Sequence, residues 1–252
     1  MKKICIIEQK AGFGDIIFCQ GIANHFYKLG YRIVWPIVKE LLDSVSNLNS
    51  VIEFYDYEKD FPLKEMYLNC YYQKQILKNN NEDIFLPLGY AADIAKRITT
   101  NINDISIMSA KYTICDLSWN EWKNNLSFKR NEKKENELFY DVLKIKDKED
   151  YIFYNQMYGT QPNINNKDIS SIVKTFDLPS YELKIIDGFT LFDWCKVFEN
   201  MHSTVIVDTS LMYILETLNL KNKNNFICVP RNTETVSQIK HLFNIPWKYT
   251  NE

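Results

Sequence analysis

The amino-acid sequence predicts an α/β protein made of two doubly wound domains that face a cleft. Segments with strand and helix patterns alternate along the first half of the chain and again along the second half, and a polar, charge-rich stretch separates the two runs. A glycine-containing turn joins the first strand pattern to the first helix pattern, as in β-α-β units with parallel strands. We therefore expect an N-terminal domain at residues 1–119, a connector at 120–150 and a C-terminal domain at 151–252.

The first domain opens with an apolar run at residues 3–8, which is typical of a buried strand. An apolar stripe at spacings of four, four and three residues then predicts one helix face, formed by Phe18, Ile22, Phe26 and Leu29, and Gly30 ends that helix. Later elements of this half are a strand at 31–35 closed by Pro36, a helix at 37–48, strands at 51–55 and 83–88, and a helix at 91–98.

The connector carries a helical stripe at Leu138, Phe139, Val142 and Leu143. The second half then repeats the alternation of strands and helices. Its predicted elements are strands at 151–155, 181–186, 204–207 and 225–229, a helix face formed by Leu191, Trp194, Cys195, Phe198 and Met201, and helices at 209–218 and 235–243.

Charge and cysteine content limit the classes of function. The chain has 252 residues, and its 30 basic and 32 acidic side chains leave a net charge of -2. This balance argues against nucleic acid as a partner, because no broad basic field can bind phosphates by counterion release. The six cysteines include no C-x-x-C pair, and a chain of this length does not need disulfides. We expect reduced thiols in a cytoplasmic protein.

Membrane and metal signals are weak. The apolar run at residues 4–7 is too short for a signal peptide. No segment approaches the roughly 20 apolar residues of a membrane span, so we expect no integral membrane segment. The histidines His25, His202 and His241 do not lie at metal-ligand spacing from one another or from a cysteine, and we expect no metal.

The first candidate site is the turn formed by Gly12, Phe13, Gly14 and Asp15. Glycines between a strand and a helix let a ligand approach the backbone, and the first-turn amides then face that ligand. Asp15 is either a catalytic carboxylate or a helix cap, and the spacing favours neither. The turn lacks G-K-[ST], and the third glycine of a dinucleotide fingerprint would fall at Ile17.

The second candidate site follows the apolar strand at 204–207, where Asp208, Thr209 and Ser210 begin a helix. Free amides and hydroxyls at such a position suit a phosphate or a sugar, although an ordinary cap is the better interpretation from these residues alone. Two further candidates could bind a diphosphate. They are the loop at 155–160, which contains Gly159 and Thr160, and Arg231 after the last strand pattern.

Two segments resemble a known family. KICIIEQKAGFGDIIF is similar to the opening of heptosyltransferase-like glycosyltransferases, which have a strand followed by G-x-G-D. STVIVDTSLMYILETL is similar to their D-T-G-x-x-H segment, with Ser210 in place of the glycine and Tyr213 in place of the histidine. The resemblance implies the compact two-domain architecture called GT-B, with two Rossmann-like domains facing a cleft.

The resemblance also implies a reaction. Family members transfer a sugar from a nucleotide sugar to an acceptor hydroxyl without a metal or other cofactor, and inversion follows from direct displacement. It implies that Asp15 is the general base and that Asp208, Thr209 and Ser210 contact the donor. Together with these, Arg231 or the loop containing Gly159 and Thr160 would hold the departing diphosphate. The acceptor would be a glycan, a lipid or a protein.

Two other functions remain open at this point. The chain could be a non-catalytic protein that retains the GT-B shell and binds a nucleotide or a glycan, because Ser210 and Tyr213 depart from the family pattern. A nicotinamide- or flavin-dependent oxidoreductase is a third interpretation. It rests on the β-α-β opening alone, and no acidic residue after the strand at 31–35 plays the ribose-binding part.

Overall fold

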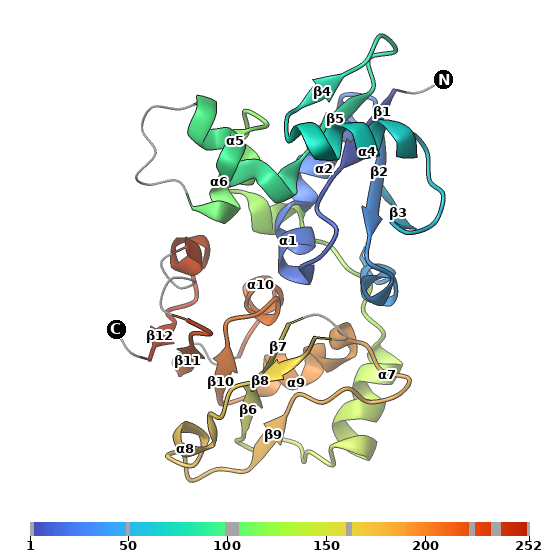
Figure 1. Ribbon diagram of the computed structural model, residues 1–252. Coiled ribbons are helices and arrows are strands. Elements are labelled where there is room, and N and C mark those ends of the chain that lie inside the picture. The colour runs from blue at the N-terminus through green and yellow to red at the C-terminus, as the bar shows by residue number, and fades with distance from the viewer. Residues whose placement is uncertain are drawn as a thin grey trace. The chain divides into compact units, whose positions relative to one another are not determined.

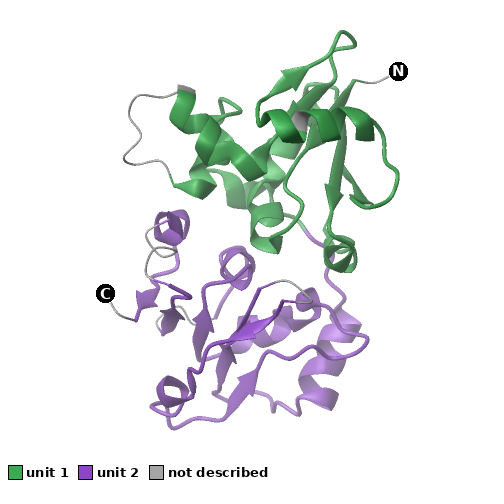
Figure 2. Cartoon of the chain, in the orientation of Figure 1, with its two compact units in different colours: residues 1–127 green, residues 128–252 purple. Residues whose placement is uncertain are grey.

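The structure is a computed structural model that describes residues 3–48, 51–98, 106–159, 163–221, 225–232 and 238–250. The chain forms two compact units, residues 1–127 and residues 128–252, coloured separately in Figure 2. Within the described residues, each unit contains a five-stranded sheet whose strands are joined mainly through helices (Figure 1). Of the expected connector, residues 120–127 belong to the first unit and residues 128–150 to the second.

The first unit contains a sheet with the strand order β3-β2-β1-β5-β4. All neighbouring strands are parallel except β4, which runs antiparallel to β5. Its elements are β1 (Ile4–Ile7), α1 (Phe13–Phe18), α2 (Gln20–Lys28), β2 (Arg32–Ile37), η1 (Lys39–Leu41), α3 (Leu42–Val45), β3 (Ile52–Asp56), α4 (Lys64–Gln73), β4 (Leu77–Lys78), β5 (Ile84–Leu86), η2 (Leu88–Tyr90), α5 (Ala91–Ile98), α6 (Ile107–Thr113) and η3 (Trp122–Asn125).

Strand order creates a switch point in this sheet. From β1 the chain moves outward on one side through β2 and β3, and it then returns to place β5 on the other side of β1. In open α/β sheets, ligands bind outside the carboxyl ends of the strands at such a point. The segments that leave β1 and β5 therefore frame the expected binding position of the first unit.

Several elements of the first unit differ from the sequence prediction. The helix predicted at 37–48 is replaced by η1 and the four-residue α3. The predicted first helix is divided at Cys19 into α1 and α2, and Leu29 at its end is 59% exposed. Strand β2 does not stop before Pro36 but continues to Ile37. Pro36 is tolerated because the pairing of β2 with β1 ends at Val34, so the missing N–H of the proline removes no bond to β1.

The second unit contains an entirely parallel sheet with the order β12-β11-β10-β6-β9. Its elements are α7 (Glu132–Asn136), the π-helical turn η4 (Glu137–Val142), β6 (Ile152–Asn155), β7 (Met157–Tyr158), β8 (Asn165–Asn166), α8 (Ser170–Val173), β9 (Ser180–Glu182), η5 (Leu191–Trp194), α9 (Cys195–Asn200), β10 (Ser203–Val207), α10 (Leu211–Leu215), β11 (Phe226–Val229), η6 (Lys240–Leu242) and β12 (Lys248–Tyr249).

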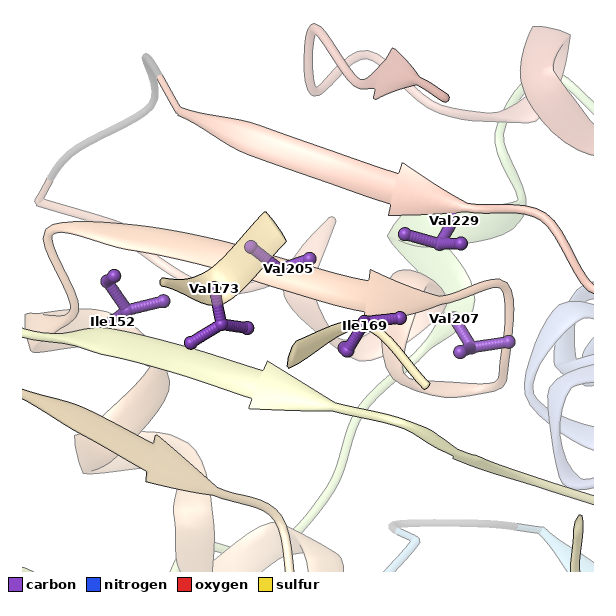
Figure 3. Close-up of a cluster of buried hydrophobic side chains, with 6 residues drawn as sticks. All are labelled: Ile152, Ile169, Val173, Val205, Val207 and Val229. Carbon is purple, nitrogen blue, oxygen red and sulfur yellow. The ribbon is translucent and has the colours of Figure 1, made fainter. Parts of the chain in front are cut away.

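The order of this second sheet corresponds to the flavodoxin-like arrangement, whose switch point lies between the first and third strands of the unit. Those strands are β6 and β10. Strand β10 is buried along its whole length, as expected for a central strand covered on both faces. A cluster of branched aliphatic side chains packs around it and fixes the sheet, as Figure 3 shows for Ile152, Ile169, Val173, Val205, Val207 and Val229.

The predicted elements of the second unit are present with shorter bounds. The strand predicted at 181–186 is β9, which ends at Glu182, and the helix predicted at 209–218 is limited to α10. Part of the helix predicted at 235–243 lies outside the described residues, and η6 is its described portion. No helix among the described residues is both long and apolar enough to cross a membrane.

Candidate functional site

The predicted motifs lie at the switch point of the sheet to which each belongs. In the first unit, the turn from Gly12 to Asp15 follows β1, and η2 follows the neighbouring strand β5. In the second unit, the loop with Gly159 follows β6, and Asp208 follows the neighbouring strand β10. Each pair of adjacent strands therefore delivers candidate residues to the edge where α/β proteins bind ligands.

Gly12 controls the conformation of the first turn. It precedes α1 with φ 88° and ψ 91°, in the region that favours glycine. A Cβ atom at this position would lie 2.3 Å from Oδ2 of Asp15. Phe13 is buried and Gly14 is half-buried within α1. Position 12 therefore requires glycine for two reasons. The backbone has a positive φ, and a larger side chain would collide with the candidate catalytic carboxylate of Asp15.

Asp15 does not cap α1, because no side chain caps the start of that helix. Its carboxylate Oδ1 lies 2.9 Å from Nζ of Lys111. The Asp15 side chain is 28% exposed, whereas the Lys111 side chain is 3% exposed. Asp15 is thus an acidic residue of the first helical turn, while Gly12 occupies the N-cap position. The structure presents a partly accessible carboxylate backed by a buried cation.

A second carboxylate, Glu8, lies at the same switch point but is buried. The N–H of Gly89, in η2, donates to Glu8 Oε2 at 3.2 Å and to the Glu8 carbonyl oxygen at 2.9 Å. Burial raises the pKa of the Glu8 carboxyl, while the Gly89 N–H, Lys10 and Lys111 oppose that rise. Glu8 therefore stabilises the contact between the β1 and β5 loops, and Asp15 is the more accessible of these two acids.

Aromatic rings and lysines form a further feature of the first unit, which we call the tyrosine–lysine surface: Lys10, Tyr57, Tyr71, Lys74 and Tyr90. Lys10 Nζ lies 5.0 Å from the ring centroid of Tyr57 and 4.1 Å from that of Tyr71. Lys74 Nζ lies 4.6 Å from the Tyr90 centroid. No ion pair recorded for the described residues involves either lysine.

Three members of this surface follow strands at their carboxyl ends: Lys10 after β1, Tyr57 after β3 and Tyr90 after β5. The other two come from the region of α4: Tyr71 lies in this helix, and Lys74 follows its last residue. Hydrogen bonding with Tyr90 and the nearby Lys10 charge lower the pKa of the Tyr71 hydroxyl. The tyrosine–lysine surface therefore offers ring faces, hydroxyls and positive charge at the edge of the sheet that carries Asp15.

In the second unit, Asp208 is completely buried and binds Arg231 through both carboxylate oxygens. The backbone N–H of Arg231 donates to Oδ1, and its Nε donates to Oδ2 at 3.1 Å. Burial raises the pKa of Asp208, and the Arg231 charge and hydrogen bonds counteract that effect. The Arg231 side chain is 38% exposed. Asp208 therefore orients an accessible guanidinium rather than presenting its own carboxylate.

Thr209 and Ser210 are half-buried and lead into α10. Ser210 occupies the cap position without a side-chain cap bond, and Thr209 Oγ1 accepts a long hydrogen bond of 3.4 Å from the Leu211 N–H. Tyr213, which replaces the histidine of the family pattern, is buried with its ring centroid 5.0 Å from that of Phe243. The substitution thus places an aromatic packing residue inside the unit.

The loop after β6 is a small hairpin, because β7 pairs antiparallel with β8. Asn155 braces it by donating to the Met157 carbonyl at 3.0 Å and accepting from the Met157 N–H at 3.1 Å. Gly159 has φ 101°, and a Cβ there would lie 2.3 Å from the Asn163 carbonyl oxygen. Thr160 lies outside the described residues. The described part of this segment, residues 155–159, therefore includes a paired strand and is not a plain turn.

Two lysines at these edges were not singled out from the sequence. Lys111 pairs with Asp15 although 96 positions separate them. Lys167, after β8, donates to the carbonyl oxygen of Pro230, immediately before Arg231. Both contacts join segments that are distant in the chain, so no local spacing could have indicated them. Among the described residues, no group of three or more His, Cys, Asp or Glu side chains could hold a metal ion.

Comparison with solved structures gives a fold-level match. The structure is similar to the crystal structure of a glycosyl transferase family 9 protein from Veillonella parvula DSM 2008, with a TM-score of 0.52, 10% sequence identity, and coverage of 99% of this chain and 86% of that chain. No protein-family model matches the chain, and no curated protein matches its sequence.

Two further matches are structures of the iron-containing glycosyltransferase TibC. The dodecameric protein from enterotoxigenic E. coli H10407 has a TM-score of 0.47 and 9% identity, covering 90% of this chain and 58% of TibC. The complex of TibC with ADP-D-beta-D-heptose has a TM-score of 0.43 and 9% sequence identity. The match covers 91% of this chain and 57% of the TibC chain. The family 9 match confirms, at the level of the fold, the resemblance predicted from the two motif segments.

Proposed function

We propose that this chain is a glycosyltransferase that moves a sugar from a nucleotide-sugar donor to an acceptor hydroxyl. One observation carries the proposal: the residues predicted from the two motif segments lie at the switch points of two separate sheets, each between parallel strands. A fold similar to that of a family 9 glycosyl transferase supports it.

Asp15 is the proposed general base of the first unit. It is partly exposed, it follows a turn that glycine keeps open, and it forms an ion pair with the buried Lys111. A carboxylate can take the proton of an acceptor hydroxyl as the oxygen attacks the anomeric carbon. A positioned base of this kind typically contributes about 10²–10⁴ in rate. Direct displacement without a covalent intermediate inverts the anomeric configuration.

The donor's diphosphate is the proposed ligand of the second unit. Arg231 supplies a guanidinium whose only recorded bonds with described residues are those to Asp208. Its terminal nitrogens suit bidentate contact with phosphate. Lys167 adds a second positive charge next to Pro230, and the hydroxyls of Thr209 and Ser210 lie at the end of β10. These cations would stabilise the leaving diphosphate in place of a metal ion.

The acceptor is the proposed ligand of the tyrosine–lysine surface. Aromatic faces pack well against the C–H surfaces of sugar rings, and the phenol hydroxyls and ammonium groups can bond to the polar substituents of a ligand. This surface belongs to the same sheet edge as Asp15, so an acceptor bound there would reach the base from within one unit.

Transfer from a panel of nucleotide sugars, with and without EDTA, tests this function. We expect a product with inverted anomeric configuration by NMR and the same rate in EDTA. Asp15→Asn should lower turnover at least about 10²-fold, which is the contribution of a positioned base, and leave donor affinity unchanged by calorimetry. Near-normal turnover in Asp15→Asn would remove Asp15 from the base role. Donor binding without transfer across the panel would favour a binding protein instead.

A further inference from the structure

The buried ammonium of Lys111 contacts three acceptors of the first unit. Nζ donates to the carbonyl oxygen of Leu88 at 3.3 Å and to Oε1 of Gln9, and it forms an ion pair with Asp15, 2.9 Å from Oδ1. Because these contacts are made by a side chain that is only 3% exposed, Lys111 is not available to bind a substrate directly.

The three acceptors come from the three segments that frame the switch point. Gln9 follows β1, Leu88 follows β5, and Asp15 lies on α1. Lys111 comes from a fourth element, α6, which is held close to α1 because the Tyr112 hydroxyl donates to the Phe18 carbonyl oxygen at 2.6 Å. The N-terminus of α6 is closed by Ser106, whose Oγ accepts from the Ser109 N–H at 3.0 Å. One cation thus fixes these segments relative to one another.

The Asp15 carboxylate lies between a buried cation and an open turn. Oδ1 lies 2.9 Å from Nζ of Lys111. Oδ2 lies over Gly12, at the position where a Cβ atom would come within 2.3 Å. The Asp15 side chain is 28% exposed, so a substrate can reach the carboxylate that Lys111 holds.

We propose that Lys111 is a positioning residue that holds the Asp15 carboxylate where it receives the proton of the acceptor. This inference rests on the proposed function. As the acceptor oxygen forms its bond to the anomeric carbon, its O–H bond breaks and the proton moves to the Asp15 carboxylate. The bond from the anomeric carbon to the donor phosphate breaks at the same time, and its electron pair leaves with the nucleoside diphosphate.

The test is Lys111→Met in the full chain, assayed under the conditions in which wild type transfers sugar. We expect kcat to fall about 10–100-fold, since a displacement of the Asp15 carboxylate by about 1 Å can lower the rate by up to about 100-fold. The donor KM should stay unchanged. In Lys111→Ala, added ethylammonium should restore part of the lost rate, and ethanol at the same concentration should not.

Ser109→Ala is the matched control for lost helix stability. It removes buried hydrogen bonds from α6 without changing Lys111 or Asp15, so kcat should stay at the wild-type value while thermal stability falls. A Lys111→Met variant that keeps kcat would overturn the inference. Loss of rate in Lys111→Ala without rescue by ethylammonium would also overturn it.

The outcome for Asp15→Asn separates this inference from the proposed function. If Asp15→Asn loses turnover but Lys111→Met does not, the role of Lys111 is wrong and the general base stands. If wild type transfers no sugar from any donor, or if Asp15→Asn stays active, the proposed function fails and the role of Lys111 fails with it.

Discussion

Gly12→Ala perturbs the candidate base without changing any functional group. The backbone at position 12 has φ 88°, which disfavours residues with a Cβ atom by about 1–2 kcal/mol. The new Cβ would also lie 2.3 Å from Asp15 Oδ2, whereas ordinary contact begins at 3.4 Å. The carboxylate must therefore move by about 1 Å, because the end of a side chain yields more easily than the backbone.

The expected loss in rate follows from that displacement. A shift of about 1 Å in a reacting group can cost about 10²-fold, and here it would also strain the 2.9 Å contact with Lys111. We predict that Gly12→Ala lowers kcat about 100-fold and lowers the free energy of unfolding by about 1–2 kcal/mol. Sugar-transfer kinetics and urea denaturation measure the two effects.

Gly30→Ala separates backbone strain from the steric effect. Gly30 has φ 91°, nearly the value of Gly12, but a Cβ there would meet nothing within 4 Å. Gly30→Ala should therefore lose a similar free energy of unfolding and keep its full rate. Equal rates for the two variants would refute the reasoning, because they would show that the space above Gly12 has no bearing on Asp15.

Three other perturbations have defined outcomes. Arg231→Gln should weaken binding of a nucleoside diphosphate about 10-fold or more by calorimetry, since a charged hydrogen bond contributes about 1.5–3 kcal/mol; unchanged affinity would exclude this guanidinium from the site. Tyr71→Ala should raise the acceptor KM, whereas Tyr72→Ala, whose ring is 78% exposed, should not, and equal KM values would count against the tyrosine–lysine surface. Arg32 lowers the pKa of Glu53 through a hydrogen bond, so the pair stabilises the fold above the ordinary carboxyl pKa of 4.5 and loses this effect as the pH falls through the lower folded value. Because both side chains are about 40% exposed, Glu53→Gln should lower the free energy of unfolding by at most about 1 kcal/mol at pH 7 and by less at pH 3, and a larger deficit at pH 3 would contradict the sign.

Most strands could be predicted from the sequence because they are buried on both faces. A parallel strand such as β1 or β10 is a continuous apolar run, which a single sequence displays directly. Helix bounds were less accurate. The spacing of apolar side chains predicted neither the division of the first helix at Cys19 nor the early end of α10.

The candidate site was predictable only where it is local in sequence. Gly12 and Asp15 are three positions apart, and their strand-to-helix setting gave the signal. The residues that pair with the two aspartates could not be predicted in this way, because they are distant in the sequence. Lys111 reaches Asp15 from α6, and Arg231 meets Asp208 because β11 lies beside β10. Whether each aspartate caps a helix or binds a cation is decided by those long-range contacts.

The location of a bound nucleoside diphosphate tests the central claim most directly. Crystals grown with the nucleotide should show its phosphates at the carboxyl edge of the second sheet, between β6 and β10, in contact with Arg231. A pocket of about 940 Å³ at the opposite edge, lined in part by Arg130, Lys146 and Lys221, is the alternative position within the same unit. Phosphates bound there, with the carboxyl edge unoccupied, would contradict the account.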